Sequence, residues 1–186
     1  MQKDFNIHIN KNLSILKEGK LLIAISGGID SVALAHLCQN SNLSFSLAHC
    51  NFNLRAEESN KDEAFVEELA TEHKRSIQMA ARELRYDWFK ELAEQLKFDY
   101  ILTAHHADDN LETFLINFTR GTGLNGLTGI PMINDNIVRP LLPFSRSQIE
   151  DYVKENQISW REDGSNASRK YLRNKLRHEV VPILKE

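Results

Sequence analysis

Two adjacent glycines end the first apolar stretch of the sequence, in a loop that could bind an anion. Gly27 and Gly28 follow the apolar run 21–25 and precede a segment rich in Ala, Val and Leu. Adjacent glycines let the backbone turn tightly and bring its N–H groups close to an anion, and the start of a helix adds the positive end of its dipole. The loop has neither the lysine of the kinase-type P-loop nor the Gly-x-Gly-x-x-Gly pattern. Its residues are Ser26, Gly27, Gly28, Ile29, Asp30 and Ser31. The alternative is an ordinary turn between a strand and a helix.

A second polar loop places two carboxylates three residues apart. Asp109 and Glu112 follow His105 and His106, and their spacing puts both on one face of a helix that begins there. We expect this helix start to be exposed. Two carboxylates in such a place could bind a metal ion, an ammonium group or only water. The His and Asp residues also resemble a transition-metal site.

Two further stretches have the composition of functional loops. Residues 49–59 are too polar for a core and too long for a tight connection, although Arg55 and the glutamates beside it could form only a solvated helix start. Residues 120–131 contain four of the eight glycines, which is typical of a loop that needs unusual dihedral angles or close approach of a substrate. Arg120 opens this loop and Arg139 follows it. Each could be structural, and we expect one of them to face the ligand.

The carboxy-terminal end is basic, whereas the rest of the chain is acidic. Residues 1–159 hold 16 Lys and Arg against 22 Asp and Glu, and residues 160–186 hold 7 against 4. Arg169, Arg173 and Arg177 are four residues apart and form one stripe of a predicted helix, which Lys170 and Lys175 widen. A solvated helix face is the commonest role of such a run, and binding of a polyanion is the alternative.

Short apolar runs alternate with helical patterns along the chain. We predict strands at 21–25, 45–48, 100–104 and 137–140, and helices at 30–39, 62–73, 77–96 and 111–118. In the last of these helices, we expect Leu111, Phe114, Leu115 and Phe118 to face the core. Only residues 74–76 lie between the predicted helices 62–73 and 77–96. Either they form a helical hairpin, or a strand that belongs between them is missing from the sequence, which we favour.

This alternation predicts an α/β fold, a doubly wound parallel sheet with helices on both faces and a small helical appendage at the carboxy terminus. Ligands in such folds bind at the carboxyl ends of the strands, so the loops after Ile25, Ala48 and Ala104 should carry the chemistry. We place the main domain at residues 1–143 and the appendage at 144–186.

The appendage has two predicted helices. Ser145 and Gln148 match the spacing of a capping box, and Ile149, Tyr152 and Val153 form the buried stripe of the first helix. Ser168 could cap the second helix, whose buried stripe would be Leu172, Leu176 and Val180.

Composition excludes several classes of protein. The 186 residues are 41% hydrophobic and 26% charged with a net charge of −3, which is an ordinary globular balance. Cys38 and Cys50 are the two cysteines and do not form a Cys-x-x-Cys pair, so no zinc or iron–sulfur site is indicated. Two free thiols fit a reducing cytoplasm. No signal peptide or apolar stretch long enough for a bilayer is evident, and we expect a cytoplasmic protein without membrane contact.

Taken together, these runs resemble the tRNA(Ile)-lysidine synthases, which are PP-loop ATP pyrophosphatases. Residues 26–31 match their Ser-Gly-Gly-x-Asp-Ser signature, and residues 49–59 match His-x-Asn-x-x-Leu-Arg-x-x-Glu-Ser. Phe52 and Asn53 depart from the family, which more often has His-Gly there. Residues 120–131 and 137–141 are characteristic of the family, and residues 170–182 match Lys-Tyr-Leu-Arg-Asn-Lys-x-Arg-His-Glu-x-x-Pro. The resemblance covers residues 21–184.

The resemblance implies an adenine nucleotide alpha hydrolase-like PP-loop fold and a two-step reaction. ATP adenylates O2 of the wobble cytidine of an isoleucine tRNA, and lysine then attacks C2 and displaces AMP to give lysidine. Residues 26–31 would bind the β- and γ-phosphates, Asp30 would also bind Mg²⁺, and Arg120 or Arg139 would face the nucleotide or the adenylate. Free L-lysine would be bound by Asp109 and Glu112, and tRNA by Arg169, Lys170, Arg173 and Arg177. This fold needs only Mg²⁺ on the phosphates, which argues against a transition metal.

The family also has carboxy-terminal domains beyond the position of Glu186, and a homodimer is a candidate assembly. Two other functions remain open. One is another PP-loop tRNA modifier, a cytidine thiolase, although that chemistry usually uses Cys-x-x-Cys pairs. The other is a non-catalytic module that binds a nucleotide or tRNA. ATP–pyrophosphate exchange that depends on tRNA and lysine separates the three.

Overall fold

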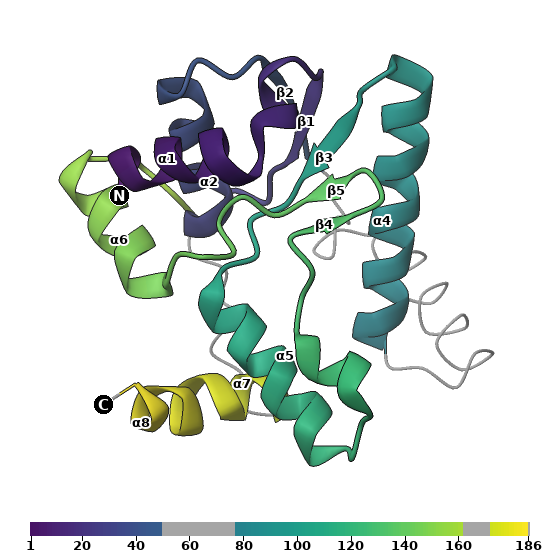
Figure 1. The fold of residues 1–186 in the computed structure, drawn as a ribbon, viewed down its shortest axis with the longest axis vertical. Helices are drawn as coiled ribbons and strands as arrows, with labels where there is room; N and C mark the ends of the chain where they lie inside the picture. Colours follow the sequence, from purple (N-terminus) through teal and green to yellow (C-terminus); the bar gives the residue numbers. More distant parts are fainter. Residues whose placement is uncertain (50–76, 162–171, 186) are drawn as a thin grey trace, which may run out of the picture.

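In the part of the chain that the structure describes, helices surround a five-stranded sheet with the strand order β2-β1-β3-β5-β4 (Figure 1). The structure is a computed structural model that describes residues 1–49, 77–161 and 172–185, and for residues 77–85 and 125 only the backbone. The strands are β1 (Leu21–Ala24), β2 (Phe45–Ala48), β3 (Tyr100–Leu102), β4 (Ile133–Asn134) and β5 (Ile137–Val138). The pairs β1–β2, β1–β3 and β3–β5 are parallel, which confirms the predicted sheet. Strand β4 pairs antiparallel with β5 and was not predicted.

Helices cover both faces of this sheet. The elements are α1 (Gln2–Asn12), η1 (Ser14–Lys17), α2 (Ile29–Asn40), α4 (Ile77–Leu96), α5 (Ala107–Thr119), η2 (Leu124–Thr128), α6 (Arg146–Glu155), α7 (Leu172–Lys175), η4 (Leu176–Val180) and α8 (Val181–Leu184). On one face, Leu21 and Ile23 of β1 pack with residues of α1, α2 and α6. On the other, Leu22 packs with Phe89 and Ala93 of α4. Because alternate side chains of a strand point to opposite faces, a strand covered on both sides must be apolar throughout.

The amino-terminal helix α1 was not predicted. Phe5, Ile9, Leu13 and Leu16 are fully or almost fully buried in the core that α2 and α6 complete. These residues are spaced by four, four and three, which is a helical pattern. The charged and polar residues between these positions obscure the helical pattern in the sequence.

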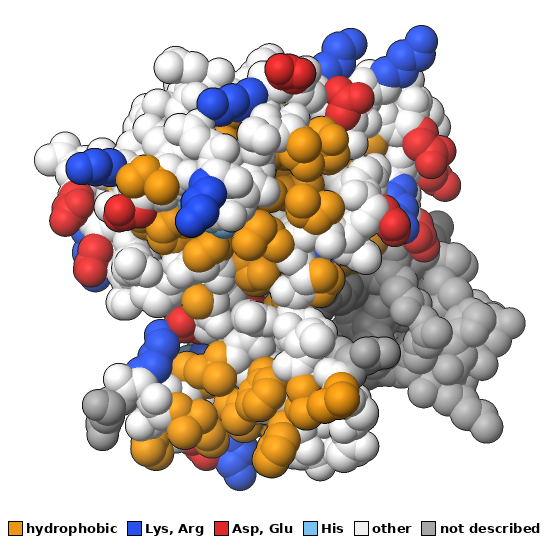
Figure 2. Space-filling model, in the orientation of Figure 1, with side chains coloured by type: hydrophobic (Ala, Val, Ile, Leu, Met, Phe, Trp, Pro, Cys, Tyr) orange, Lys and Arg blue, Asp and Glu red, His pale blue; other side chains and the backbone are white. Residues whose placement is uncertain are grey.

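Helix α5 differs from its prediction. Phe118 is 63% exposed and Phe114 is also exposed, and their rings stack with centroids 6.0 Å apart instead of facing the core. The buried residue of this helix is Glu112. Figure 2 shows hydrophobic side chains gathered on the lower part of the molecule, where Figure 1 places α5, η2 and α8.

Helix α6 confirms its prediction. Ser145 and Gln148 form the capping box, and Ile149, Tyr152 and Val153 are buried. The Tyr152 hydroxyl donates a hydrogen bond to Oε1 of Gln2 at 2.8 Å, so α6 is joined to the amino-terminal helix. It therefore packs in the same core as α1 and α2.

The carboxy-terminal segment 172–184 is helical with a π-helical turn, η4, directly before α8. Pro182 lies in the first turn of α8 and has no N–H to donate, which accounts for a break in the regular helix there. Leu176 is buried as predicted, but Leu172 is exposed, so the predicted stripe is wrong at that position. The predicted cap at Ser168, helix 62–73 and the missing strand lie outside the described residues.

Candidate functional site

The predicted phosphate loop lies between the end of β1 and the start of α2. Gly27 has φ +87°, and apart from its two sequence neighbours no described residue has an atom within 4 Å of where its Cβ would be, so this part of the structure leaves the space above the loop open. The loop is held by Ser31, whose buried hydroxyl donates to the carbonyl of Gly28 at 2.9 Å and accepts from the N–H of Ser26 at 3.2 Å. Nδ1 of His49, at the end of β2, lies 2.7 Å from the carbonyl oxygen of Ile25. The loops after β1 and β2 are therefore adjacent.

Asp30 is the acidic residue of this loop, in the first turn of α2, and its side chain is 27% exposed. Nη1 of Arg146 lies 2.5 Å from Oδ2 of Asp30. The other oxygen, Oδ1, is buried and accepts no hydrogen bond from the residues that the structure describes. Burial raises the pKa of Asp30, and the charges of His106 and Arg146 offset this only in part.

The Asp30 carboxylate fits a Mg²⁺ ligand. A buried oxygen without a hydrogen bond has lone pairs that a cation can use, and Mg²⁺ prefers carboxylate and phosphate oxygens with several waters. Within the described residues no group of three His, Cys, Asp or Glu side chains could hold a metal ion. Asp30 would therefore supply one ligand, and the phosphates and water the others.

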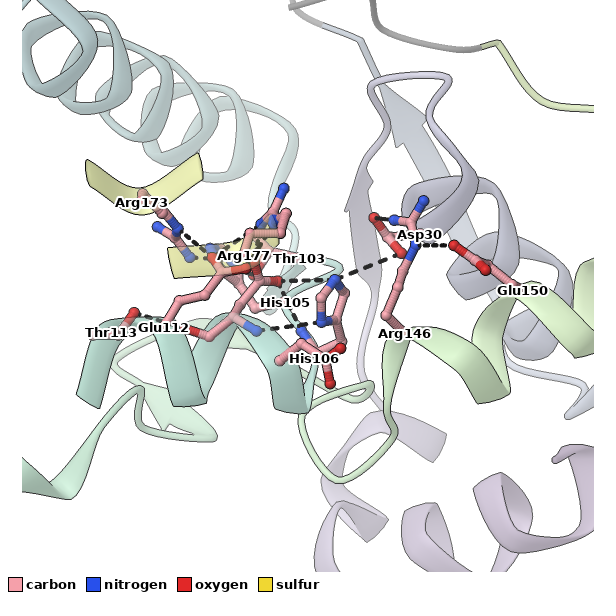
Figure 3. A network of polar contacts seen from close by, with 12 residues as sticks. Asp30, Thr103, His105, His106, Glu112, Thr113, Arg146, Glu150, Arg173 and Arg177 are labelled. Carbon is pink, nitrogen blue, oxygen red and sulfur yellow. Dashed lines mark hydrogen bonds and ion pairs between the residues drawn. The ribbon is translucent and has the colours of Figure 1, made fainter. Parts of the chain in front are cut away.

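His106 lies between Asp30 and Asp109 (Figure 3). It caps α5, since its Nδ1 accepts a hydrogen bond from the N–H of Asp109 at 3.3 Å while Oδ2 of Asp109 accepts from the N–H of His106 at 3.1 Å. Its Nε2 lies 3.4 Å from Oδ2 of Asp109 and 3.8 Å from Oδ1 of Asp30. The phosphate loop and the carboxylate pair of α5 thus belong to one polar network.

The carboxylate pair of α5, Asp109 and Glu112, is ion-paired rather than exposed, which corrects the prediction of an exposed helix start. Glu112 is fully buried, and Asp109 is largely buried. Nε of Arg177 donates to Oε1 of Glu112 at 2.6 Å, and Nε of Arg173 donates to Oε2 at 2.7 Å. The Nη2 atoms of both arginines reach Oδ1 of Asp109, at 3.1 and 3.2 Å. Two negative and two positive charges therefore balance in this cluster.

This pairing shifts the pKa values of Asp109 and Arg177. Burial raises the pKa of Asp109, but the charges of His106, Arg173 and His105 outweigh it and lower the pKa overall. Burial alone would lower the pKa of Arg177, and its hydrogen bonds and ion pairs with Glu112 and Asp109 raise it instead. Asp109 and Arg177 are therefore both held in their ionised forms near neutral pH.

The two candidate arginines of the glycine-rich loop occupy different places. Arg120 is exposed and ends α5, eleven residues and about 16 Å along the helix from Asp109. Arg139 is 5% exposed, and its Nη1 donates to the carbonyl of Pro131 at 2.7 Å. Its Nε is buried, and no described residue accepts a hydrogen bond from it. Arg139 therefore anchors the end of the loop, and which arginine faces a ligand stays a prediction.

The loop itself is pinned to α5. Oδ1 of Asn110 accepts from the N–H of Ile130 at 2.6 Å, and Nδ2 of Asn117 donates to the carbonyl of Gly126 at 2.8 Å. Gly129 has φ +74°, and a Cβ there would lie 2.1 Å from Oδ1 of Asn110. Close approach of backbone to a side chain explains this glycine.

Sequence reasoning missed Arg146 and Glu150, and it considered His106 only as part of a transition-metal site, against which the resemblance argued. Nε of Arg146 donates to Oε1 of Glu150 at 2.9 Å, one helical turn later, which is the spacing of an ordinary surface ion pair. Nothing local distinguishes it, since its partner Asp30 is 116 residues away in the sequence. Arg169 and Lys170, predicted to contact tRNA, lie outside the described residues.

Three curated proteins to which this chain is similar carry the same name. This chain is 45% identical over 193 residues to tRNA(Ile)-lysidine synthase of Porphyromonas gingivalis. The matched region covers 92% of this chain and 42% of that protein. The enzyme of the same name from Bacteroides thetaiotaomicron is 43% identical, over 96% of the chain and 46% of the relative. The enzyme of this name from Chlorobaculum tepidum is 38% identical, over 100% of this chain and 62% of the relative. The chain thus spans less than two thirds of the length of each.

Solved structures share the fold at low sequence identity. A U34-tRNA thiolase from Methanococcus maripaludis with its [4Fe-4S] cluster has a TM-score of 0.61 at 14% identity, over 94% of this chain and 69% of that one. An NH3-dependent NAD synthetase from Campylobacter jejuni has a TM-score of 0.53 at 13% identity, over 84% of this chain and 72% of that one. A PP-loop domain profile matches residues 1–184. With the loop after β1 and the parallel sheet that positions it, this match shows that the chain belongs to the PP-loop domain family.

Proposed function

We propose that this chain carries the catalytic domain of a tRNA(Ile)-lysidine synthase, which uses ATP to join lysine to the wobble cytidine of an isoleucine tRNA. One observation carries the proposal: His106 places the acidic residue of the phosphate loop and the carboxylate pair of α5 in one network. An enzyme that activates one substrate with ATP and then adds an amine needs a phosphate site and an ammonium site side by side. The curated relatives with this name support the choice of substrates.

In the first step the phosphate loop would hold the β- and γ-phosphates. The start of α2 and the N–H of Gly27 would stabilise negative charge at the open side of the loop, where the N–H of Gly28 donates to Oγ of Ser26 at 3.3 Å. Mg²⁺, when bound at Asp30, would neutralise charge on the phosphates. O2 of the cytidine attacks the α-phosphorus, the bond to the β-phosphate oxygen breaks, and pyrophosphate leaves.

In the second step Asp109 and Glu112 would bind the ammonium group of lysine. The deprotonated amine attacks C2 of the cytidine, the C2–O bond breaks, and AMP leaves. In the structure, both carboxylates are neutralised by Arg173 and Arg177. The same arginines are predicted to contact tRNA phosphates. Movement of the guanidinium groups to the phosphates would return two negative charges to the ammonium site.

The thiolase alternative has less support. Cys38 is buried in the core, and burial raises the pKa of its thiol to about 12, so it is not a reactive thiolate. Cys50 lies outside the described residues. The structural likeness to a tRNA thiolase, at 14% identity, shows a shared fold.

Mass spectrometry of isoleucine tRNA tests the proposal. The tRNA is incubated with the chain, ATP and lysine, and the wobble nucleoside should gain one lysine, with AMP and pyrophosphate formed in equal amounts. Exchange of pyrophosphate into ATP should depend on tRNA. Gain of sulfur would establish the thiolase, and unchanged tRNA with retained ATP binding would establish a non-catalytic module. A homodimer stays a prediction for solution measurements of mass.

A further inference from the structure

One arginine lies next to the phosphate loop although the loop has no basic residue of its own. Residues 26–31 contain no Lys or Arg, whereas the kinase-type P-loop supplies a lysine to the β- and γ-phosphates. Arg146, the first residue of α6, lies with Nη1 2.5 Å from Oδ2 of Asp30. Its side chain is 37% exposed, so a ligand in the loop could reach it.

The fold fixes the position of this arginine. Its helix begins at the capping box of Ser145 and Gln148 and is held in the core by Ile149 and Val153, which are fully buried. Beyond the helix, the N–H of Arg161 donates to the carbonyl of Gly27 at 3.0 Å. The first residue of α6 and a residue beyond the end of this helix therefore both contact the phosphate loop.

The contacts of Arg146 leave part of its guanidinium group available. Within the described part of the chain, its hydrogen bonds use Nη1 toward Asp30 and Nε toward Glu150. The Nη2 edge has no hydrogen bond there. Glu150 holds the Nε side, so the guanidinium plane is oriented without help from a ligand. A planar, permanently charged fork of N–H groups suits phosphate oxygens better than any other side chain.

We propose that Arg146 is a phosphate-binding residue that contacts the β- or γ-phosphate of ATP, in the role that the lysine has in the kinase-type P-loop. Glu150 positions it, and Asp30 holds it near the loop before the nucleotide binds. The inference rests on the proposed function, which makes ATP the nucleotide. It predicts that α6, expected from the sequence to belong to the appendage, completes the phosphate site.

Binding of ATP and of AMP, measured by calorimetry without metal, tests this. Arg146→Gln should weaken ATP binding about 10- to 100-fold, the range of one hydrogen bond to a charged group, and leave AMP binding unchanged. Arg146→Lys should restore part of the loss because it keeps the charge. Lys154→Gln, which removes an exposed cation from the same helix, should bind ATP like the parental chain.

A second pair of variants separates direct contact from an effect through Asp30. In an Asp30→Asn background, Arg146→Gln should still weaken ATP binding about tenfold or more if the arginine touches phosphate. No further loss in that background, or equal losses for ATP and AMP, would overturn the proposal. Thermal unfolding of each variant checks the fold. A parental chain that binds no ATP, either with or without Mg²⁺, would overturn the proposed function and this inference together, whereas normal ATP binding by Arg146→Gln overturns the inference alone.

Discussion

Replacing Arg177 by Met should destabilise the chain by about 2 to 3 kcal/mol. The change removes three N–H···O contacts to carboxylates, at 2.6, 3.0 and 3.1 Å. Breaking a fully buried ion pair costs about 3–5 kcal/mol, and breaking an exposed one less than about 1. Glu112 is fully buried, but Arg177 is one third exposed, and Arg173 still pairs with both carboxylates. The expected loss lies between those limits, toward the buried one.

Urea unfolding at pH 7, followed by tryptophan fluorescence, measures this loss. The midpoint should fall by about 1 M, given a slope of about 2–3 kcal/mol per M for a chain of this size. Lys175→Met is the matched control, because Lys175 is an exposed cation of the same helical segment. A difference between the two variants below about 0.5 kcal/mol would refute the reasoning.

The loss should also depend on pH. The pKa of Asp109 in the folded chain lies below the ordinary value of 3.8, so its ion pairs contribute stability that is present above that value. This stability is lost as the pH falls through the folded pKa. The difference between the parental chain and Arg177→Met should therefore be complete at neutral pH and shrink below about pH 4. A difference that stays constant into that range would show that the arginine acts through packing of its stem and not through its charge.

Three other predictions concern the proposed reaction. Asp30→Ala should abolish adenylation without loss of stability, because burial of the ionised carboxylate already opposes folding. Pyrophosphate release at the parental rate would contradict the phosphate-loop assignment. Asp109→Asn or Glu112→Gln should raise the Michaelis constant for lysine far more than that for ATP, because each removes a charge-assisted hydrogen bond to an ammonium group, worth about 1.5–3 kcal/mol. Equal effects on the two Michaelis constants would mean that the pair only holds the site together. Replacing Arg169 and Lys170 by Gln should weaken tRNA binding and lower the log–log salt slope by about 0.7 to 0.9 for each lost phosphate contact; an unchanged slope would leave these residues as a solvated surface.

The strands of the sheet could be predicted because burial on both faces leaves a simple signal. Leu21, Leu22 and Ile23 are apolar in succession, as a strand covered by helices on two sides must be. The hairpin of β4 and β5 has no such signal, since Ile133 and Asn134 of β4 are exposed. Tertiary pairing rather than local composition makes that strand.

Helix α5 was predicted in place but with the wrong buried face. Phe114 and Phe118 have the spacing of a core stripe, and nothing near them in the sequence indicates exposure. Glu112 is buried instead because Arg173 and Arg177, more than 60 residues later, supply its counter-charges. Local periodicity cannot anticipate such a partner.

The same distinction separates the predicted from the unpredicted parts of the site. The phosphate loop is a continuous motif, so its residues could be named from the sequence. Arg146 could not, because its partner Asp30 is distant in the sequence and the arginine has the spacing of a surface pair with Glu150. A side chain that acts across the fold has no local pattern.

The contact between α1 and α6 has a consequence for how the chain folds during synthesis. Gln2 and Tyr152 are 150 residues apart, and the rings of Phe5 and Phe144 lie 6.2 Å apart across the same junction. At about 5–20 residues per second, a ribosome would add Tyr152 roughly 8 to 30 s after Gln2. Throughout that interval the apolar side of α1 lacks its final cover. Because closure of so long a loop is slow, the growing chain should depend on chaperones until α6 has left the ribosome.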